Sequence, residues 1–296
     1  MGRGNWTDFV GGLVLALAMG IWLVPAAEGA PVFADSFTVM RSAVGGGLVT
    51  IFDDTFGDGV PPPSAPDILT VPPTPASYAV QGTPTEAGGK LRLDTVGALV
   101  TPGIGIPGNV FVESAFLLTS ISPLNTLGLR QGTAFSATAI FDLAIPGPIR
   151  ESYNVALLDG TDVILGNDFL WLGVARQVDG VVRVRLRHLD RSADTAEDLE
   201  SVDLDSMHDQ IALTLAKLDA GSDAITASFA YVDGGVVGNP TPIATTPDIF
   251  HGEDWTRAGV ILTSPVPAAA APGPSGWLLL GVGFAGAVSL VRKPKA

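Results

Sequence analysis

The feature that most constrains this chain is an alternation of apolar and polar residues through its middle part. In the stretch VVRVRLRHL, which begins at Val181, aliphatic residues alternate with Arg183, Arg185 and Arg187. Successive side chains of a β-strand point to opposite faces, so this period of two places the aliphatic residues on one face and the arginines on the other. The pattern predicts a strand with one buried and one polar face.

The same alternation recurs between Pro31 and Pro265, and short turn sequences separate the runs. Asp-Gly pairs at 159–160, 179–180 and 233–234 are typical of tight turns between antiparallel strands. We expect strands at 49–56, 90–94, 110–119, 133–143, 153–158, 169–176, 181–189, 209–219, 224–235 and 258–263. Many short strands with one apolar face predict an all-β fold in which two antiparallel sheets pack as a sandwich.

Two stretches are not expected to form central strands. Val60–Ala76 contains seven prolines, and proline cannot donate the hydrogen bond that a central strand needs. We expect a solvated loop or linker there. The acid-rich stretch Asp190–Asp209 is expected to be an exposed loop, with a helical turn at Ala196–Leu199.

Charge and cysteine content exclude several kinds of site. The chain has a net charge of −14 and no cysteine. Once the four basic and two acidic residues of the terminal segments are set aside, 12 basic and 28 acidic residues remain, or about −16. This charge disfavours nucleic acid or anionic lipid as a ligand of the middle part and is compatible with cation binding. The lack of cysteine excludes disulfides, thiol catalysis and cysteine-based zinc sites.

The first 29 residues have the features of a secretory signal peptide. Arg3 gives a positive start, Phe9–Val24 is apolar, and Pro25 ends the run. Ala27 and Gly29 provide the small residues that a signal peptidase requires, which predicts cleavage after Gly29. The alternative is an uncleaved membrane anchor.

The end of the chain has a second apolar segment. Gly276–Val291 has 16 residues, which as a helix span roughly 24 Å, short of a hydrocarbon core of about 30 Å. Such a segment can still insert if the bilayer thins locally. Arg292, Lys293 and Lys295 would then stay in the cytoplasm, and the rest of the chain would lie outside.

The whole tail resembles a PEP-CTERM sorting signal, in which a short Pro-x-Pro-Ser element precedes a brief membrane helix and a basic end. Pro272, Gly273, Pro274 and Ser275 occupy the motif position, although Gly273 stands where the family has Glu. The resemblance implies a Gram-negative bacterium that makes exopolysaccharide, and removal of the tail by an exosortase on the way to the cell surface or matrix. The alternative is a permanent C-terminal anchor.

The middle part resembles the concanavalin A-like, laminin-G-like jelly roll. The similarity lies in FDDTFGDG (52–59), YAVQGTPTEAGGKLRLD (78–94), the strand pair that ends in the YVDGG turn (211–235) and WTRAGVILTS (255–264). It implies one jelly-roll domain. The expected organisation is a signal peptide at 1–29, the jelly-roll sandwich at 30–266 with a Pro-rich loop at 60–76, a linker at 267–275, a transmembrane helix at 276–291 and a cytoplasmic tail at 292–296.

The sequence does not predict an enzyme. The hydrolases of this fold family carry a Glu-x-Asp-x-x-Glu strand, in which paired carboxylates cleave a glycosidic bond. The nearest stretch, Glu197–Asp205, lacks that spacing. The histidines, His188, His208 and His251, lie away from any Gly-x-Ser-x-Gly nucleophile elbow.

A calcium site is the metal site that the sequence offers. Asp53, Asp54 and Asp58 surround the expected opening strand, and Glu253 and Asp254 precede the expected last strand. The first and last strands of an antiparallel sandwich often lie side by side, which would bring these hard oxygen ligands together. The alternative is that they are ordinary surface acids.

Three aromatic residues are candidate platforms for sugar rings, namely Trp171, Tyr153 and Trp255. The alternative is that alternation hides these rings in the core. We therefore expect an exported, non-catalytic surface or matrix protein that binds exopolysaccharide. The alternatives are a secreted glycan hydrolase or lyase of the same fold and a purely structural envelope protein.

Overall fold

The described part of the chain is built from strands and turns. The computed structural model describes residues 31–43, 46–57, 68–69, 78–81, 84–86, 88–94, 112–119, 129, 132–147, 151–159, 169–190, 195–222, 224–245 and 255–265. No helix occurs in these ranges, and so none that could cross a membrane. The all-β prediction is confirmed, whereas the signal peptide at 1–29 and the helix at 276–291 lie outside the described residues.

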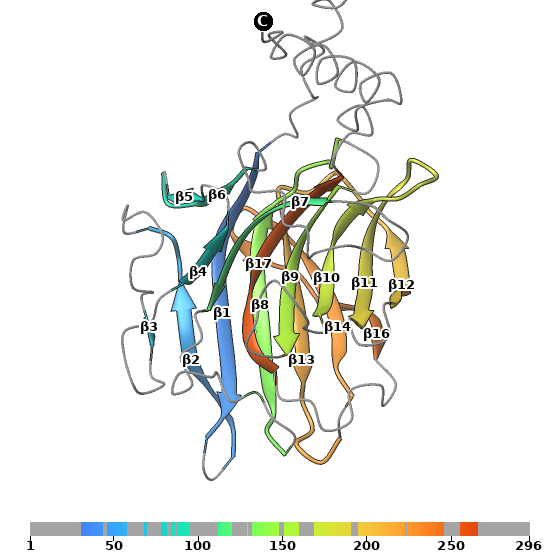
Figure 1. Cartoon of the computed structure of the whole chain (residues 1–296). Coiled ribbons are helices and arrows are strands. Elements are labelled where there is room, and N and C mark those ends of the chain that lie inside the picture. The colour runs from blue at the N-terminus through green and yellow to red at the C-terminus, as the bar shows by residue number, and fades with distance from the viewer. Residues whose placement is uncertain are drawn as a thin grey trace, which may run out of the picture.

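The strands form two antiparallel sheets that face each other (Figure 1). The ten-stranded sheet has the path β15-β14-β13-β8-β1-β2-β3, with β16 beside β14 and β6 and β5 beside β1. Its strands are β1 (Val32–Ser42), β2 (Leu48–Asp54), β3 (Ile68–Leu69), β5 (Thr85–Glu86), β6 (Leu91–Leu93), β8 (Phe135–Asp142), β13 (Gln210–Lys217), β14 (Thr226–Asp233), β15 (Val236–Val237) and β16 (Thr241–Thr245).

The seven-stranded sheet has the order β12-β11-β10-β9-β17-β7-β4. Its strands are β4 (Tyr78–Gln81), β7 (Val112–Thr119), β9 (Ser152–Asp159), β10 (Phe169–Arg176), β11 (Val182–Asp190), β12 (Thr195–Asp203) and β17 (Trp255–Pro265). Four strands that are consecutive in the chain lie side by side in it, and the last strand continues the sheet beyond them.

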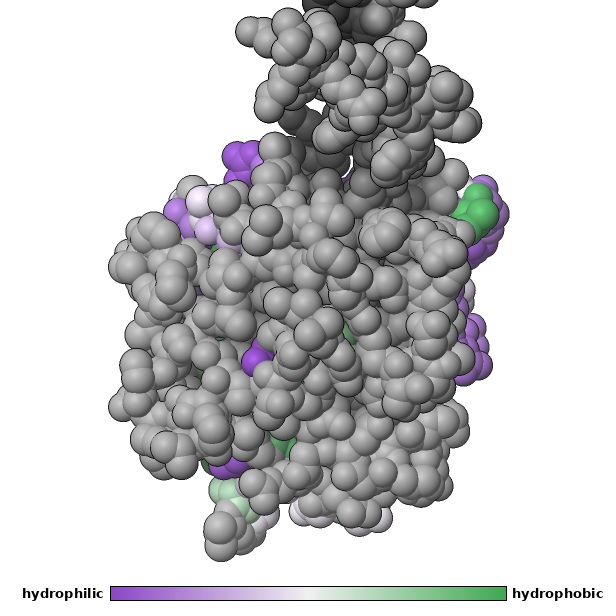
Figure 2. Space-filling view, in the orientation of Figure 1, coloured by the Kyte–Doolittle hydropathy of each residue, from purple (hydrophilic) through white to green (hydrophobic). Residues whose placement is uncertain are grey.

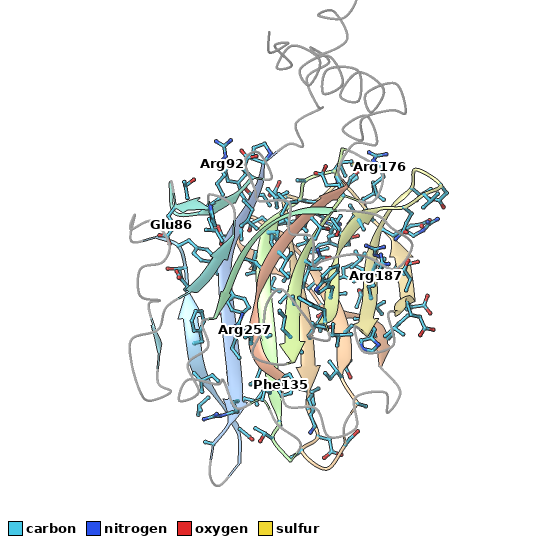
Figure 3. The ribbon with its side chains drawn as sticks, in the orientation of Figure 1. Glu86, Arg92, Phe135, Arg176, Arg187 and Arg257 are labelled. Atoms are coloured by element: carbon cyan, nitrogen blue, oxygen red, sulfur yellow. The ribbon has the colours of Figure 1, made fainter. Side chains whose placement is uncertain are left out.

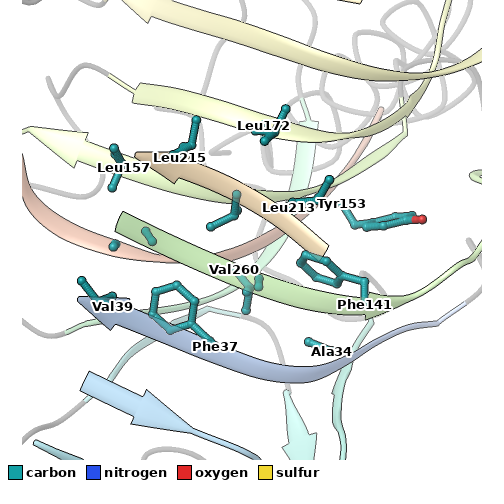
Figure 4. Close-up of a cluster of buried hydrophobic side chains, with 14 of the residues drawn as sticks. Ala34, Phe37, Val39, Phe141, Tyr153, Leu157, Leu172, Leu213, Leu215 and Val260 are labelled. Atoms are coloured by element: carbon teal, nitrogen blue, oxygen red, sulfur yellow. The ribbon is translucent and has the colours of Figure 1, made fainter. Parts of the chain in front are cut away.

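Alternation places the core between the sheets, as β8 illustrates. Phe135, Ala137, Ala139 and Phe141 are buried, and the residues between them are partly exposed. The core includes Phe37 and Val39 from β1, Leu213 and Leu215 from β13, Leu157 from β9, Leu172 from β10 and Val260 from β17 (Figure 4). The rings of Phe141 and Tyr153 meet across the two sheets, with centroids 5.1 Å apart. Burying each such side chain contributes roughly 1.5–3 kcal/mol.

The prediction that the first and last strands lie side by side is wrong. The strand expected at 49–56 is β2, and it belongs to the ten-stranded sheet, whereas β17 belongs to the seven-stranded sheet. β1 precedes β2, pairs with both β2 and β8, and is not among the strands expected from the sequence. Since β1 occupies the middle of its sheet, the opening element of the fold is a central strand.

The prediction of an exposed loop at Asp190–Asp209 is also wrong, because Thr195–Asp203 forms the edge strand β12. Leu199 and Val202 pack against the core, and a shift of register between Leu186 and Arg187 on β11 accommodates their spacing. Asp198 and Asp203, on either side of this pair, contact the arginines of β11. Charge on an edge strand discourages pairing with another chain.

Within the proline-rich stretch Val60–Ala76 the structure describes residues 68–69. These two residues agree with the prediction that the stretch forms no central strand. Ile68–Leu69 forms β3, which pairs with Phe52 and Asp53 at the edge of the ten-stranded sheet. An edge position requires hydrogen bonds on one side only.

Replacing Leu213 with alanine tests the inter-sheet core. Leu213 is completely buried, and Leu218, just beyond the end of β13, is 70% exposed. We expect Leu213→Ala to lower the free energy of unfolding by about 2–5 kcal/mol because it leaves a cavity, whereas Leu218→Ala changes it by less than about 0.5 kcal/mol. Urea unfolding followed by tryptophan fluorescence measures both, and equal effects would contradict this core.

Candidate functional site

The most distinctive polar feature is the outer side of β11, where Arg183, Arg185 and Arg187 form a row that we call the arginine row. Val184 and Leu186 point the other way and belong to the inter-sheet core. The alternation of the sequence thus gives β11 one apolar face and one cationic face. Figure 3 shows Arg187 at the right-hand side of the seven-stranded sheet, among β10 and β11.

Aspartates hold the arginine row in place. The Arg183 guanidinium donates from Nε to Asp203 Oδ1 and from Nη1 to Asp179 Oδ2, each at 2.8 Å. Asp198 Oδ1 serves two arginines, at 3.3 Å from Arg185 Nη1 and 3.7 Å from Arg187 Nε. The hydrogen bond from Arg183 lowers the pKa of Asp179 below its usual range. The row therefore presents donors and acceptors side by side rather than bare positive charge.

Trp171 lies beside the arginine row on the same side of the sheet. Its register partner on β11 is Arg187, so the two side chains are neighbours on one face. The indole is 2% exposed and packs edge-on against Phe169, with ring centroids 5.5 Å apart. Its Nε1 has no hydrogen-bond partner within the described part of the chain.

A polar network continues this face across β9 and β17. The Asn154 amide nitrogen donates to Ser152 Oγ at 3.1 Å and to the Ile261 carbonyl at 3.3 Å, and Ser152 Oγ lies 2.8 Å from Thr263 Oγ1. Gly173 on β10 is essential to this arrangement, because a Cβ there would lie 2.1 Å from Asn154 Oδ1. Glycine thus makes room for a buried amide beside Arg185.

Exposure increases from the centre of this face toward its margin. Arg185 is 7% exposed, Arg187 15%, Arg183 24% and Asp198 45%. A ligand on this face would therefore meet the margin formed by β11 and β12. The sugar platforms considered from the sequence have different positions: Tyr153 is in the core, Trp171 is beside the arginine row, and the side chain of Trp255 lies outside the described residues.

One carboxyl group is buried near the start of β9. Glu151 is 2% exposed, and its Oε2 has no hydrogen-bond partner among the residues described. Burial raises the pKa of Glu151 from 4.5 to about 7, although a hydrogen bond from the Gly147 backbone and the charge of Arg176 act in the opposite direction. Arg176 itself donates to the Pro146 carbonyl at 2.7 Å and to the Gly180 carbonyl at 2.9 Å.

His208 forms a second polar cluster at the end of β14. Its ring stacks on Tyr231 with centroids 4.0 Å apart, and its Nδ1 lies 2.8 Å from Asp233 Oδ2. The hydrogen bond from His208 lowers the pKa of Asp233. The other ring nitrogen lies 3.7 Å from Asp205 Oδ2, and the Asp205 N–H donates to the Tyr231 hydroxyl at 2.8 Å. These contacts fasten the loop before β13 to β14.

The calcium prediction rested on a convergence of two strands that does not occur. Thr38 donates a hydrogen bond to Asp53, and Asp54, which is buried, accepts one from the Phe56 N–H at 2.8 Å. Asp58 and Asp254 lie outside the described residues. Among the residues that are described, no group of three or more histidine, aspartate or glutamate side chains could hold a metal ion. Calcium binding stays a prediction.

The other predicted site residues lie outside the described residues. They are Pro272, Gly273, Pro274 and Ser275 of the sorting motif and Arg292, Lys293 and Lys295 of the basic tail. No protein-family model, curated protein or solved structure matches this chain.

Sequence reasoning missed the aspartates of β12 and the buried Glu151. The sequence did contain a signal for the aspartates of β12. The strand with three alternating arginines is followed by a stretch in which Asp198 and Asp203 are interspersed with the apolar Leu199 and Val202, as in a second strand. No local pattern distinguishes Glu151 from an exposed glutamate.

The buried carboxyl predicts a pH-dependent stability. The folded-state pKa of Glu151 is about 7 against 4.5, so its contribution is fully present below about pH 4.5 and is lost as the pH rises through about 7, a change on the order of 3 kcal/mol. We expect Glu151→Gln to remove this slope, and Glu200→Gln, an exposed control on β12, to retain it. Thermal unfolding between about pH 5 and about pH 8 measures both, and a wild-type slope in the Glu151 variant would contradict the assignment.

Proposed function

We propose that this chain is an exported, non-catalytic surface or matrix protein that binds exopolysaccharide along the arginine row. The arginine row itself is the observation that carries the proposal. It combines fixed guanidinium donors and carboxylate acceptors on one face of a sheet. Sugars present hydroxyl groups that both donate and accept hydrogen bonds, and these match the partly exposed guanidinium and carboxylate groups of the β11–β12 margin.

The charge of the site favours a neutral glycan. Each arginine of the row lies within ion-pair distance of an aspartate, and the chain as a whole has a net charge of −14. A polyanionic sugar would have to displace those aspartates and overcome the overall repulsion. We therefore place neutral exopolysaccharide ahead of uronate-rich polymers as the ligand.

The sheet arrangement supports a jelly-roll sandwich of the concanavalin A-like kind. Two antiparallel sheets enclose one core, and the last strand β17 lies between β9 and β7 rather than at an edge. The terminal segments support export, with a signal peptide at the start and a PEP-CTERM-like tail that an exosortase removes in a Gram-negative host. In this proposal the tail holds the chain in the inner membrane only until processing.

Polysaccharide binding is tested with Arg187→Gln, which keeps most of the aliphatic stem and removes the charge. We expect it to weaken binding of the full-length chain to immobilised dextran or galactomannan by about tenfold, the effect of losing a charged hydrogen bond of about 1.5 kcal/mol. Arg92→Gln is the matched control, since Arg92 is exposed, lies in the other sheet and pairs with Asp94. Equal affinity of the two variants would contradict the site, and stronger binding to alginate would contradict the preference for neutral sugar.

Processing of the tail is tested by mass spectrometry of the protein released at the cell surface. We expect the mature chain to begin at residue 30 and to lack Trp277–Lys295, because both terminal segments serve export. A surface-exposed product that still contains Trp277–Lys295 would show a permanent anchor instead.

A further inference from the structure

Both ends of the described chain leave the sandwich at the same end, which we call the upper end after Figure 1. β1 starts there at Val32, beside the end of β8, since Ala34 pairs with Phe141. β17 finishes there, since Thr263 pairs with Ser152 at the start of β9. The β10–β11 hairpin also turns at this end, because Arg176 pairs with Val182. In Figure 3, Arg92 and Arg176 lie at the upper end and Phe135 at the opposite end.

Exposed aliphatic side chains gather at the upper end. Eight large hydrophobic side chains of the described residues are exposed, and six of them belong to segments at this end. The six are Ile145 (44% exposed), Val178 (67%), Val181 (40%), Met207 (88%), Val236 (72%) and Val237 (53%). The other two, Val49 and Leu218, lie at the opposite end, next to the β1–β2 turn and the end of β13. Figure 2 shows hydrophobic surface at the upper right of the molecule.

Specific contacts hold these side chains in place. Arg176 joins the segment that carries Ile145 to the β10–β11 hairpin, because it donates to the carbonyls of both Pro146 and Gly180. On the other sheet, the stack of His208 on Tyr231 fixes the loop that carries Met207. β15, which carries Val236 and Val237, pairs with the end of β14. The exposed aliphatic residues are thus presented by four anchored segments.

We infer that the upper end lies against the outer surface of a lipid bilayer and that these six side chains enter its headgroup region. The inference rests on the membrane tail of the proposed function. The apolar segment 276–291 follows Pro265 after ten residues, a connection of at most about 35 Å. The other apolar segment, 9–24, precedes β1 by seven residues and joins the same end. Until processing removes these segments, either one, once inserted, holds the upper end next to the membrane.

The distribution of the six side chains favours a bilayer over a protein partner. They come from four separate segments in both sheets. A protein interface needs a contiguous, complementary patch, whereas a fluid bilayer accepts scattered apolar side chains. The net charge of −14 excludes attraction to anionic lipid as the main driving force. We therefore expect contact with zwitterionic lipid, driven by apolar insertion.

Single-cysteine labelling of the full-length chain tests this inference, since the chain has no cysteine of its own. Val178→Cys and Val236→Cys report on the upper end, and Val49→Cys and Leu218→Cys are matched controls at the opposite end. Each variant carries an environment-sensitive fluorophore and is reconstituted in phosphatidylcholine vesicles that contain a lipid-borne quencher. We expect a blue shift and several-fold stronger quenching at Val178 and Val236 than at the two control positions.

Each result decides for or against the inference. Flotation of the vesicles in a density gradient shows whether the chain is anchored in the membrane. Equal quenching at all four positions in a chain that floats with the vesicles overturns the inference but leaves the predicted membrane anchor intact. A chain that does not float overturns both the anchor and the inference, whereas glycan binding is measured independently with dextran. A blue shift at positions 178 and 236 that persists without vesicles and increases with protein concentration would show that a second copy of the chain covers this end. That result also overturns the inference.

Discussion

Face-to-face packing of the two sheets is the interaction on which the rest of this structure depends. The chain has no cysteine, so no disulfide contributes to the fold, and the described residues contain no helix that could cover a sheet. Side chains such as Phe141 and Tyr153 meet between the sheets and are fully buried. On β11 this contact uses the apolar face and leaves the other face polar, which is where the arginine row lies. The neighbouring strands β9 and β10 are instead buried on both faces.

On the outer side of the seven-stranded sheet, this strongly acidic protein pairs its arginines with aspartates. Asp198 and Asp203 on β12 lie opposite the arginines of β11. Surface ion pairs of this kind add little to stability, but they fix the geometry of the guanidinium groups. The same acids make β12 a poor template for pairing with another chain. One strand therefore both organises the candidate site and protects the edge of the sheet.

The two ends of the sandwich differ in chemistry as well as in connectivity. The upper end holds the buried Glu151, whose pKa burial raises to about 7. It also carries most of the exposed aliphatic side chains and receives both ends of the described chain. We infer that the apolar side chains of this end contact the membrane, whereas the β11–β12 margin of the seven-stranded sheet stays available to a glycan.

The sequence by itself determined which residues form most of the strands, because alternation of apolar and polar residues is a local property. It also determined the apolar character of both termini. Only the tertiary structure decided which strands pair, since β17 pairs with β9 at separations of 96 to 111 residues and with β7 at larger ones, and local pattern contains no information on such distant partners. The same reason explains why Asp190–Asp209 was misjudged. The strand at 195–203 pairs with β11, which offers arginines and a free edge, and the pKa of Glu151 is raised because the folded structure buries it.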